Sequence, residues 1–203
     1  MRARPVTFLA LLGAVLVFAV PQLQPLLIYD REAILAGEVW RLFTGNWVHF
    51  SASHLVLDLV VLGVAGAIME SRRAACWPRV LLLSPWVIGV GLLVCEPRMS
   101  FYGGLSGVAT AAVVCLALDA LHSGFIARWA GATVLLLIAA KLAFEWGTGS
   151  ALFVGTSGTE FVTSPLSHLL GGLSAVGVRW LWPEGEACME TSLDSPVRFT
   201  GQR

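Results

Sequence analysis

The chain has 203 residues, of which 57% are hydrophobic and 13% are charged. Soluble domains carry about 25% charged residues, so this composition excludes an ordinary water-soluble protein and predicts an all-α polytopic membrane protein. The 13 basic residues are balanced by 13 acidic ones. A chain without a basic excess has no charge with which to hold nucleic acid, so we expect no nucleic-acid partner.

Six segments are apolar over lengths close to the roughly 20 residues that a helix needs to cross a bilayer. In chain order they are residues 6–20, 54–69, 79–95, 106–121, 129–146 and 165–182. We therefore expect a bundle of six transmembrane helices, several of them short. The first segment follows Arg2 and Arg4 like the apolar region of a signal peptide. Its end, Val20-Pro21-Gln22-Leu23, has no small-x-small cleavage site, which predicts an uncleaved first span.

A mixed stretch, residues 21–53, separates the first two predicted spans. It combines charged residues with tryptophan and phenylalanine, which predicts an interfacial, partly re-entrant loop between helices 1 and 2. After the last span, residues 183–203 are polar and too few to bury a core of their own. The predicted organisation is a six-helix membrane domain over residues 1–182 and a short polar cytoplasmic tail over residues 183–203.

Basic residues near the span ends predict the orientation, because cytoplasmic loops carry an excess of arginine and lysine. With the amino terminus in the cytoplasm, nine of the 13 basic residues fall on the cytoplasmic side. Spans 2, 4 and 6 then all run from outside to inside, so their first turns lie at one depth. His54, Ser106 and His168 all lie in these first turns.

Ser106 lies in Gly103-Gly104-Leu105-Ser106-Gly107, where glycines allow a substrate backbone to approach the hydroxyl. The amino terminus of a helix also offers free N–H groups to a developing oxyanion. The His168 imidazole could take the serine proton and later protonate a leaving amine. Taken alone, each motif also has a structural reading, since small residues and single histidines are common at helix contacts in membranes.

Other polar residues allow further readings. His49, His54 and Asp58 are close enough in sequence to hold a zinc ion, but their spacing is not that of the HExxH zinc proteases, and we expect no metal. Lys141 and Glu145 are four residues apart, which predicts a structural ion pair near the outer interface. The four cysteines form no CxxC pair, so we expect them to pack among apolar residues rather than to bind metal or form disulfides.

Four pieces of the sequence, in order, resemble the rhomboid intramembrane serine proteases. They are Gly37-Glu38-Val39-Trp40-Arg41 with Phe43-Thr44, His49 five residues before His54, Gly104-Leu105-Ser106-Gly107, and Ser167-His168-Leu169-Leu170-Gly171. A compact six-span chain is most similar to the bacterial rhombosortase branch. That branch is associated with processing exported proteins that end in a glycine-rich signal, a membrane helix and basic residues.

The resemblance implies that Ser106 is the nucleophile and His168 the general base. It also implies that His54 and the backbone around Gly104 and Leu105 form the oxyanion site. Asp58 stands where these proteases usually have asparagine. An ionised carboxylate cannot donate a hydrogen bond to an oxyanion. Asp58 is then protonated, or turned to orient His54, or absent from the oxyanion site, and of these we expect the orienting role.

The function implied by the resemblance is an intramembrane serine endopeptidase without a cofactor. It would act on transmembrane protein substrates in the bacterial inner membrane, among lipid, with its active site towards the periplasm. Asp58 favours an alternative, an inactive rhomboid-like protein that binds or escorts membrane clients, whereas the presence of both Ser106 and His168 speaks against it. A transporter would be expected to show an inverted repeat, and no convincing one is seen. The sequence predicts neither the individual substrate nor the oligomeric state.

Overall fold

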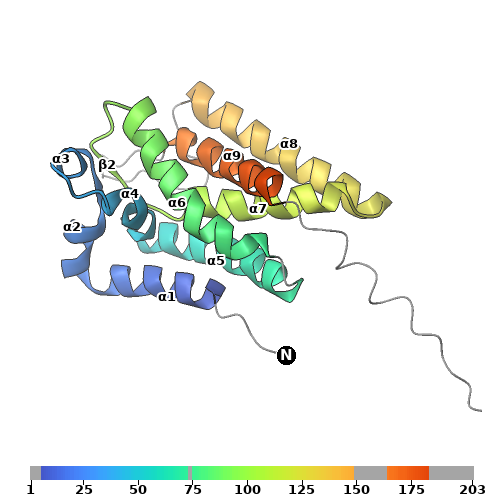
Figure 1. Ribbon diagram of the computed structural model, residues 1–203, viewed down its shortest axis with the longest axis horizontal. Coiled ribbons are helices and arrows are strands. Elements are labelled where there is room, and N and C mark those ends of the chain that lie inside the picture. Colours follow the sequence, from blue (N-terminus) through green and yellow to red (C-terminus); the bar gives the residue numbers. More distant parts are fainter. Residues whose placement is uncertain (1–5, 73–74, 149–163, 183–203) are drawn as a thin grey trace, which may run out of the picture.

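The computed structural model describes residues 6–72, 75–148 and 164–182. Each of the six predicted apolar segments forms a helix: α1 (Val6–Ala19), α5 (Ala52–Ser71), α6 (Cys76–Cys95), α7 (Ser106–Leu121), α8 (Phe125–Thr148) and α9 (Pro165–Leu181). Helices α5, α7 and α9 begin at one end of the bundle, whereas α1, α6 and α8 begin at the other (Figure 1). The predicted tail, residues 183–203, lies outside the described residues.

Three of these helices, α5, α6 and α8, are long and apolar enough to cross a membrane. Helix α1 passes the same test together with the helical turns Pro21–Leu27, from which it is bent by 97°. Helices α7 and α9 have 16 and 17 residues, which is below the usual span of about 20. The helices are therefore confirmed, while six complete crossings stay a prediction.

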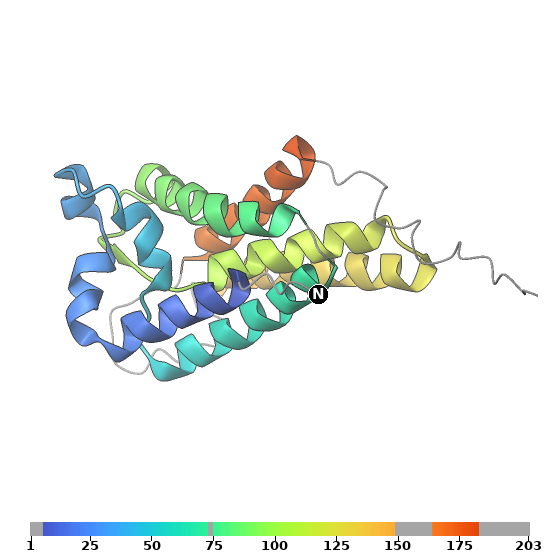
Figure 2. The same cartoon turned by 60° about the horizontal axis from the view of Figure 1, so that its bottom comes forward.

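Helix α7 is the centre of the bundle and packs against α5, α6, α8 and α9. Figure 2 shows it running between α5 on one side and α6 and α9 on the other. Most of its buried residues are alanine or glycine, and small side chains let neighbouring helices approach closely. Next to its first residue, Ser106, α7 meets α6 and α9, because a Cβ atom at Gly107 would lie 2.7 Å from Ile88 Cδ1 and 2.9 Å from the carbonyl oxygen of Ser167.

Two of the cysteines contribute to this packing. Cys76 on α6 and Cys115 on α7 are buried, with their Sγ atoms 3.4 Å apart. Cys95, at the end of α6, is exposed, so the expected apolar packing is wrong for this residue. Cys188 lies outside the described residues.

Helix α8 lies at the edge of the bundle. Gly131 and Glu145 are its buried residues. A Cβ atom at Gly131 would lie 2.6 Å from the carbonyl oxygen of Ala117, so glycine is required for α8 to touch α7 there. The remaining surface of α8 is suited to contact with lipid.

The loop between α1 and α5 is folded rather than irregular. Its elements are η1 (Pro21–Leu23), α2 (Gln24–Leu27), β1 (Tyr29–Asp30), α3 (Arg31–Leu35), α4 (Arg41–Thr44) and η2 (Gly45–Trp47). The buried Arg41 holds them together, because its Nη1 donates to the carbonyl oxygens of Pro25 and Ile28 at 2.8 and 3.0 Å. Its Nε donates to Glu38 Oε2 at 2.7 Å.

Strand β1 pairs antiparallel with β2 (Phe101–Tyr102), so that Tyr29 lies opposite Tyr102. Their rings meet edge to face with centroids 6.3 Å apart. Within the described ranges, this two-residue pair is the single departure from the predicted all-α fold. It connects the first loop to the segment that leads directly into Ser106.

Candidate active site

Ser106 is the first residue of α7 and is half-buried. The preceding turn contains Gly104 with a φ of 128°, a left-handed conformation that disfavours any residue with a side chain. A Cβ atom at Gly104 would also lie 2.6 Å from Cε1 of His54. Glycine is therefore required twice over, by the turn and by the imidazole of His54 that lies against it.

Helices α7 and α9 touch beside Ser106. A Cβ atom at Gly171 would overlap the carbonyl oxygen of Gly107, and one at Gly107 would lie 2.9 Å from the carbonyl oxygen of Ser167. Ser106 directly precedes Gly107, and His168 directly follows Ser167. This close backbone contact between the two helices thus brings the neighbours of Ser106 and His168 together.

His168 lies in the first turn of α9 with 6% of its surface exposed. Its Nδ1 lies 3.1 Å from Glu145 Oε2 and 3.0 Å from Lys141 Nζ. Within the described part of the chain, no hydrogen bond joins His168 to the Ser106 hydroxyl. Because both contacts use Nδ1, the opposite nitrogen, Nε2, is the one left for a hydroxyl.

The predicted ion pair between Lys141 and Glu145 is confirmed, with Nζ 2.7 Å from Oε1. The contact of this pair with His168 was missed by the sequence analysis. The pair precedes His168 by 23 and 27 residues, and no local pattern predicts which face of α8 meets α9. An acidic residue within a predicted membrane span was the available signal.

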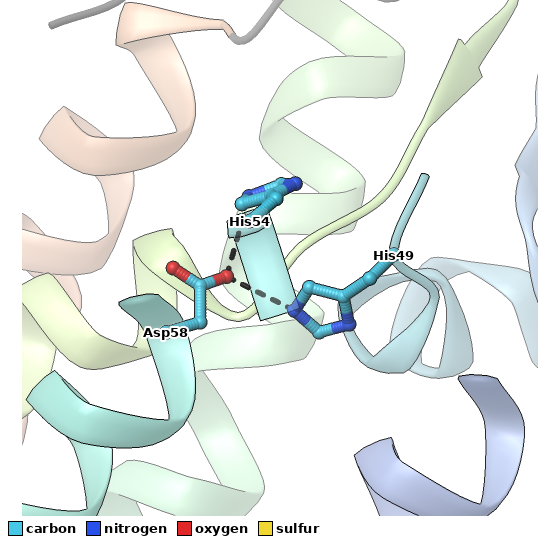
Figure 3. Close-up of side chains that lie close together, drawn as sticks. All are labelled: His49, His54 and Asp58. Atoms are coloured by element: carbon cyan, nitrogen blue, oxygen red, sulfur yellow. Dashed lines mark hydrogen bonds and ion pairs between the residues drawn. The ribbon is translucent and has the colours of Figure 1, made fainter. Parts of the chain in front are cut away.

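Asp58 lies between two imidazoles at the start of α5 (Figure 3). Its Oδ2 is 3.0 Å from His49 Nε2 and 3.3 Å from His54 Nε2. The first contact has hydrogen-bond geometry, whereas His54 Nε2 is buried without a hydrogen-bond partner among the described residues. The backbone nitrogen of Leu105 lies 3.4 Å from His49 Nε2, which ties the cluster to the turn before Ser106.

His49 is thus a central member of the site, whereas the sequence indicated it only as a possible zinc ligand and as the histidine five residues before His54. It is fully buried, and its Nδ1 lies 3.2 Å from the carbonyl oxygen of Trp47. One nitrogen or oxygen from each of His49, His54 and Asp58 lies within 4.8 Å of the others, a spacing that a metal ion would also fit. The hydrogen bond between His49 and Asp58 accounts for their short distance without a metal ion.

The family model described as Rhomboid domain matches residues 36–184. This match covers more than half of the chain and includes the turns that hold His54, Ser106 and His168. The chain belongs to the rhomboid family. Together with the apolar helices, membership in this family identifies an integral membrane protein with an all-α rhomboid bundle.

Similar curated proteins carry the name Rhomboid protease GlpG. Those of Salmonella newport (strain SL254) and Salmonella typhimurium (strain LT2) are each 30% identical to this rhomboid over 116 residues, which is 54% of this chain and 42% of theirs. The protein of Salmonella choleraesuis (strain SC-B67) is 29% identical over the same length. The chain therefore spans less than half the length of these relatives.

Proposed function

We propose that this rhomboid is an intramembrane serine endopeptidase in which Ser106 is the nucleophile and His168 the general base. The observation that carries the proposal is the contact of α7 with α9, where Gly107 and Gly171 allow a backbone approach that no side chain would permit. Ser106 and His168 flank that contact. Catalytic hydrogen bonds often tighten only when substrate binds, so the present separation is compatible with a dyad.

The reaction needs groups from this chain and water only. Ser106 Oγ attacks the scissile carbonyl carbon as His168 Nε2 takes the hydroxyl proton. His168 then gives that proton to the leaving nitrogen as the C–N bond breaks. Water attacks the acyl-enzyme ester, passes a proton to His168, and releases the acid as Ser106 Oγ is reprotonated.

The oxyanion formed in these steps would be stabilised from two sides. Free backbone N–H groups in the first turn of α7 provide one set of donors, whereas the Leu105 N–H already donates to His49 Nε2. His54 provides the other, since its Nε2 has no hydrogen-bond partner in the described ranges and lies against Gly104. Asp58 orients the two histidines rather than binding the oxyanion itself.

In the membrane, we place all six long helices as spans, with the amino terminus and the tail in the cytoplasm. The common starting end of α5, α7 and α9 (Figure 1) then faces the periplasm, and the loop between α1 and α5 lies at the outer interface. The exposed Trp40 and Leu35 in this loop suit such a position. The chain would work in a bacterial inner membrane on transmembrane segments of protein substrates.

The expected substrates are exported proteins that end in a glycine-rich signal, one membrane helix and basic residues, as for rhombosortases. Their carboxy-terminal peptides are to be compared by mass spectrometry in cells with the wild-type chain, with Ser106→Ala and without the chain. We expect the tails to be removed only in wild-type cells. Equal processing with Ser106→Ala would contradict the proposal.

A further inference from the structure

Helix α8 brings a buried carboxylate to the candidate general base. The Glu145 side chain is 1% exposed, whereas most of α8 faces outward. Its two oxygens have different partners: Oε1 lies 2.7 Å from Lys141 Nζ, and Oε2 lies 3.1 Å from His168 Nδ1. A carboxylate in this place costs desolvation free energy, which an ion pair on one oxygen and a hydrogen bond on the other offset.

We propose that Glu145 is a positioning residue that holds His168 in its reactive tautomer, which extends the dyad to Ser106–His168–Glu145. Lys141 balances the charge of Glu145 in this arrangement. The inference rests on the proposed function and adds to it a residue outside the two helices that carry the dyad.

The chemistry of the contact selects the tautomer. A carboxylate oxygen only accepts hydrogen bonds, so the contact with Glu145 requires the proton on His168 Nδ1. Nε2 then carries a lone pair, which is what a base needs to take the Ser106 proton. After that transfer the ring is positively charged, and the adjacent carboxylate stabilises it.

Lys141 makes this selection necessary. Its Nζ lies 3.0 Å from His168 Nδ1, and an ammonium group only donates hydrogen bonds. A bond from Lys141 to Nδ1 would place the ring proton on Nε2, where it would prevent His168 from acting as a base. Glu145 accepts from both groups at once and so keeps Lys141 from taking Nδ1.

The test uses the full chain in detergent with a fluorophosphonate probe. Ser106 Oγ would bond to phosphorus, fluoride would leave, and His168 would take the hydroxyl proton. We expect Glu145→Gln to lower the maximal labelling rate by about 100-fold or more, with the half-saturating probe concentration unchanged. The control Glu70→Gln changes a carboxylate that binds Thr7 far from this site, and it should label at the wild-type rate.

A labelling rate within about twofold of wild type for Glu145→Gln would overturn the inference. If Ser106→Ala abolished labelling in that same experiment, the proposed protease would stand and only the role of Glu145 would fall. A second variant, Glu145→Gln with Lys141→Met, should label faster than Glu145→Gln because the competing donor is gone. An equally slow double variant would contradict the role given to Lys141.

A measurement on the wild-type protein covers the case in which Glu145→Gln does not fold. Nitrogen NMR of ¹⁵N-histidine distinguishes the two neutral tautomers, and His168→Ala identifies the His168 signals by their loss. We expect the proton on Nδ1 and a bare Nε2. A proton on Nε2 would overturn the inference whatever the variants show.

Discussion

Asp58 stands where rhomboids usually have asparagine. The hydrogen bonds of the neighbouring His49 explain why either aspartate or asparagine can occupy this position. The carbonyl oxygen of Trp47 lies 3.2 Å from His49 Nδ1 and only accepts, so Nδ1 carries a proton. One further proton then joins His49 Nε2 to Asp58 Oδ2. An asparagine amide would donate to a bare Nε2 and make the same contact with neutral histidine.

The variants Asp58→Asn and Asp58→Leu test whether position 58 needs a side chain that hydrogen-bonds to His49. We expect Asp58→Asn to keep the fold and the fluorophosphonate reaction. Asp58→Leu removes the 3.0 Å hydrogen bond at His49 Nε2 and leaves only the 3.4 Å contact with the Leu105 N–H, so it should lower the free energy of unfolding by about 1–3 kcal/mol. Titration with SDS measures the free energy of unfolding of both variants. A stable Asp58→Leu would show that the hydrogen bond contributes nothing to the fold.

At the scale of elements, the contact of α7 with α9 depends on Gly171. A methyl group there would overlap the carbonyl oxygen of Gly107, whereas one at the adjacent Gly172 would lie 3.6 Å from Val114 Cγ2, an ordinary distance. We expect Gly171→Ala to lower the free energy of unfolding by about 1–3 kcal/mol and to slow labelling of Ser106.

The neighbouring variant Gly172→Ala is the matched control for that experiment. It adds the same methyl group to the same helix and should leave stability and labelling unchanged. If both alanine variants behaved like wild type, the tight approach of α7 to α9 would not be what brings Ser106 and His168 together.

The loop between α1 and α5 depends on Arg41 in a comparable way. Arginine spans the carbonyl oxygens of Pro25 and Ile28 and the Glu38 carboxylate, which a single ammonium group cannot do. We expect Arg41→Lys to cost about 1–3 kcal/mol of unfolding free energy. The exposed Arg128, whose Nε donates to the carbonyl oxygen of Leu121 at 3.2 Å, is the control, and Arg128→Lys should be neutral. Equal stability of the two variants would contradict the role of Arg41.

Hydropathy predicted the long helices well, because each apolar segment needs only its own residues to form a helix. It did not predict β1 pairing with β2, where about 70 residues lie between Tyr29 and Tyr102. The contact of Glu145 with His168 was missed for the same reason. Local periodicity identifies which residues form a helix, but not which partner a polar side chain meets across the bundle.

At the scale of the whole molecule, the proposed orientation in the membrane places the first residues of α5, α7 and α9 on the periplasmic side. Single cysteines are to be placed at Leu35 in α3 and at Ser123 between α7 and α8, with the native cysteines replaced. We expect a membrane-impermeant maleimide to label Leu35→Cys in spheroplasts and Ser123→Cys only after the membrane is opened. The reverse pattern would place the candidate site on the cytoplasmic side.

The candidate site was accessible to sequence reasoning because alternating helix directions put His54, Ser106 and His168 at one end. The structure adds the backbone contact at Gly107 and the second layer of His49 and Glu145 behind these residues. Those additions depend on which residues meet across the bundle, and the local pattern of one sequence does not predict such pairs.

The most direct test of the proposed catalysis is to identify the residue that a fluorophosphonate modifies. Mass spectrometry of the labelled protein should place the adduct on Ser106 in the wild type, and His168→Ala should form none. An adduct on another residue, or labelling of Ser106 that persists in His168→Ala, would contradict a serine nucleophile activated by this histidine.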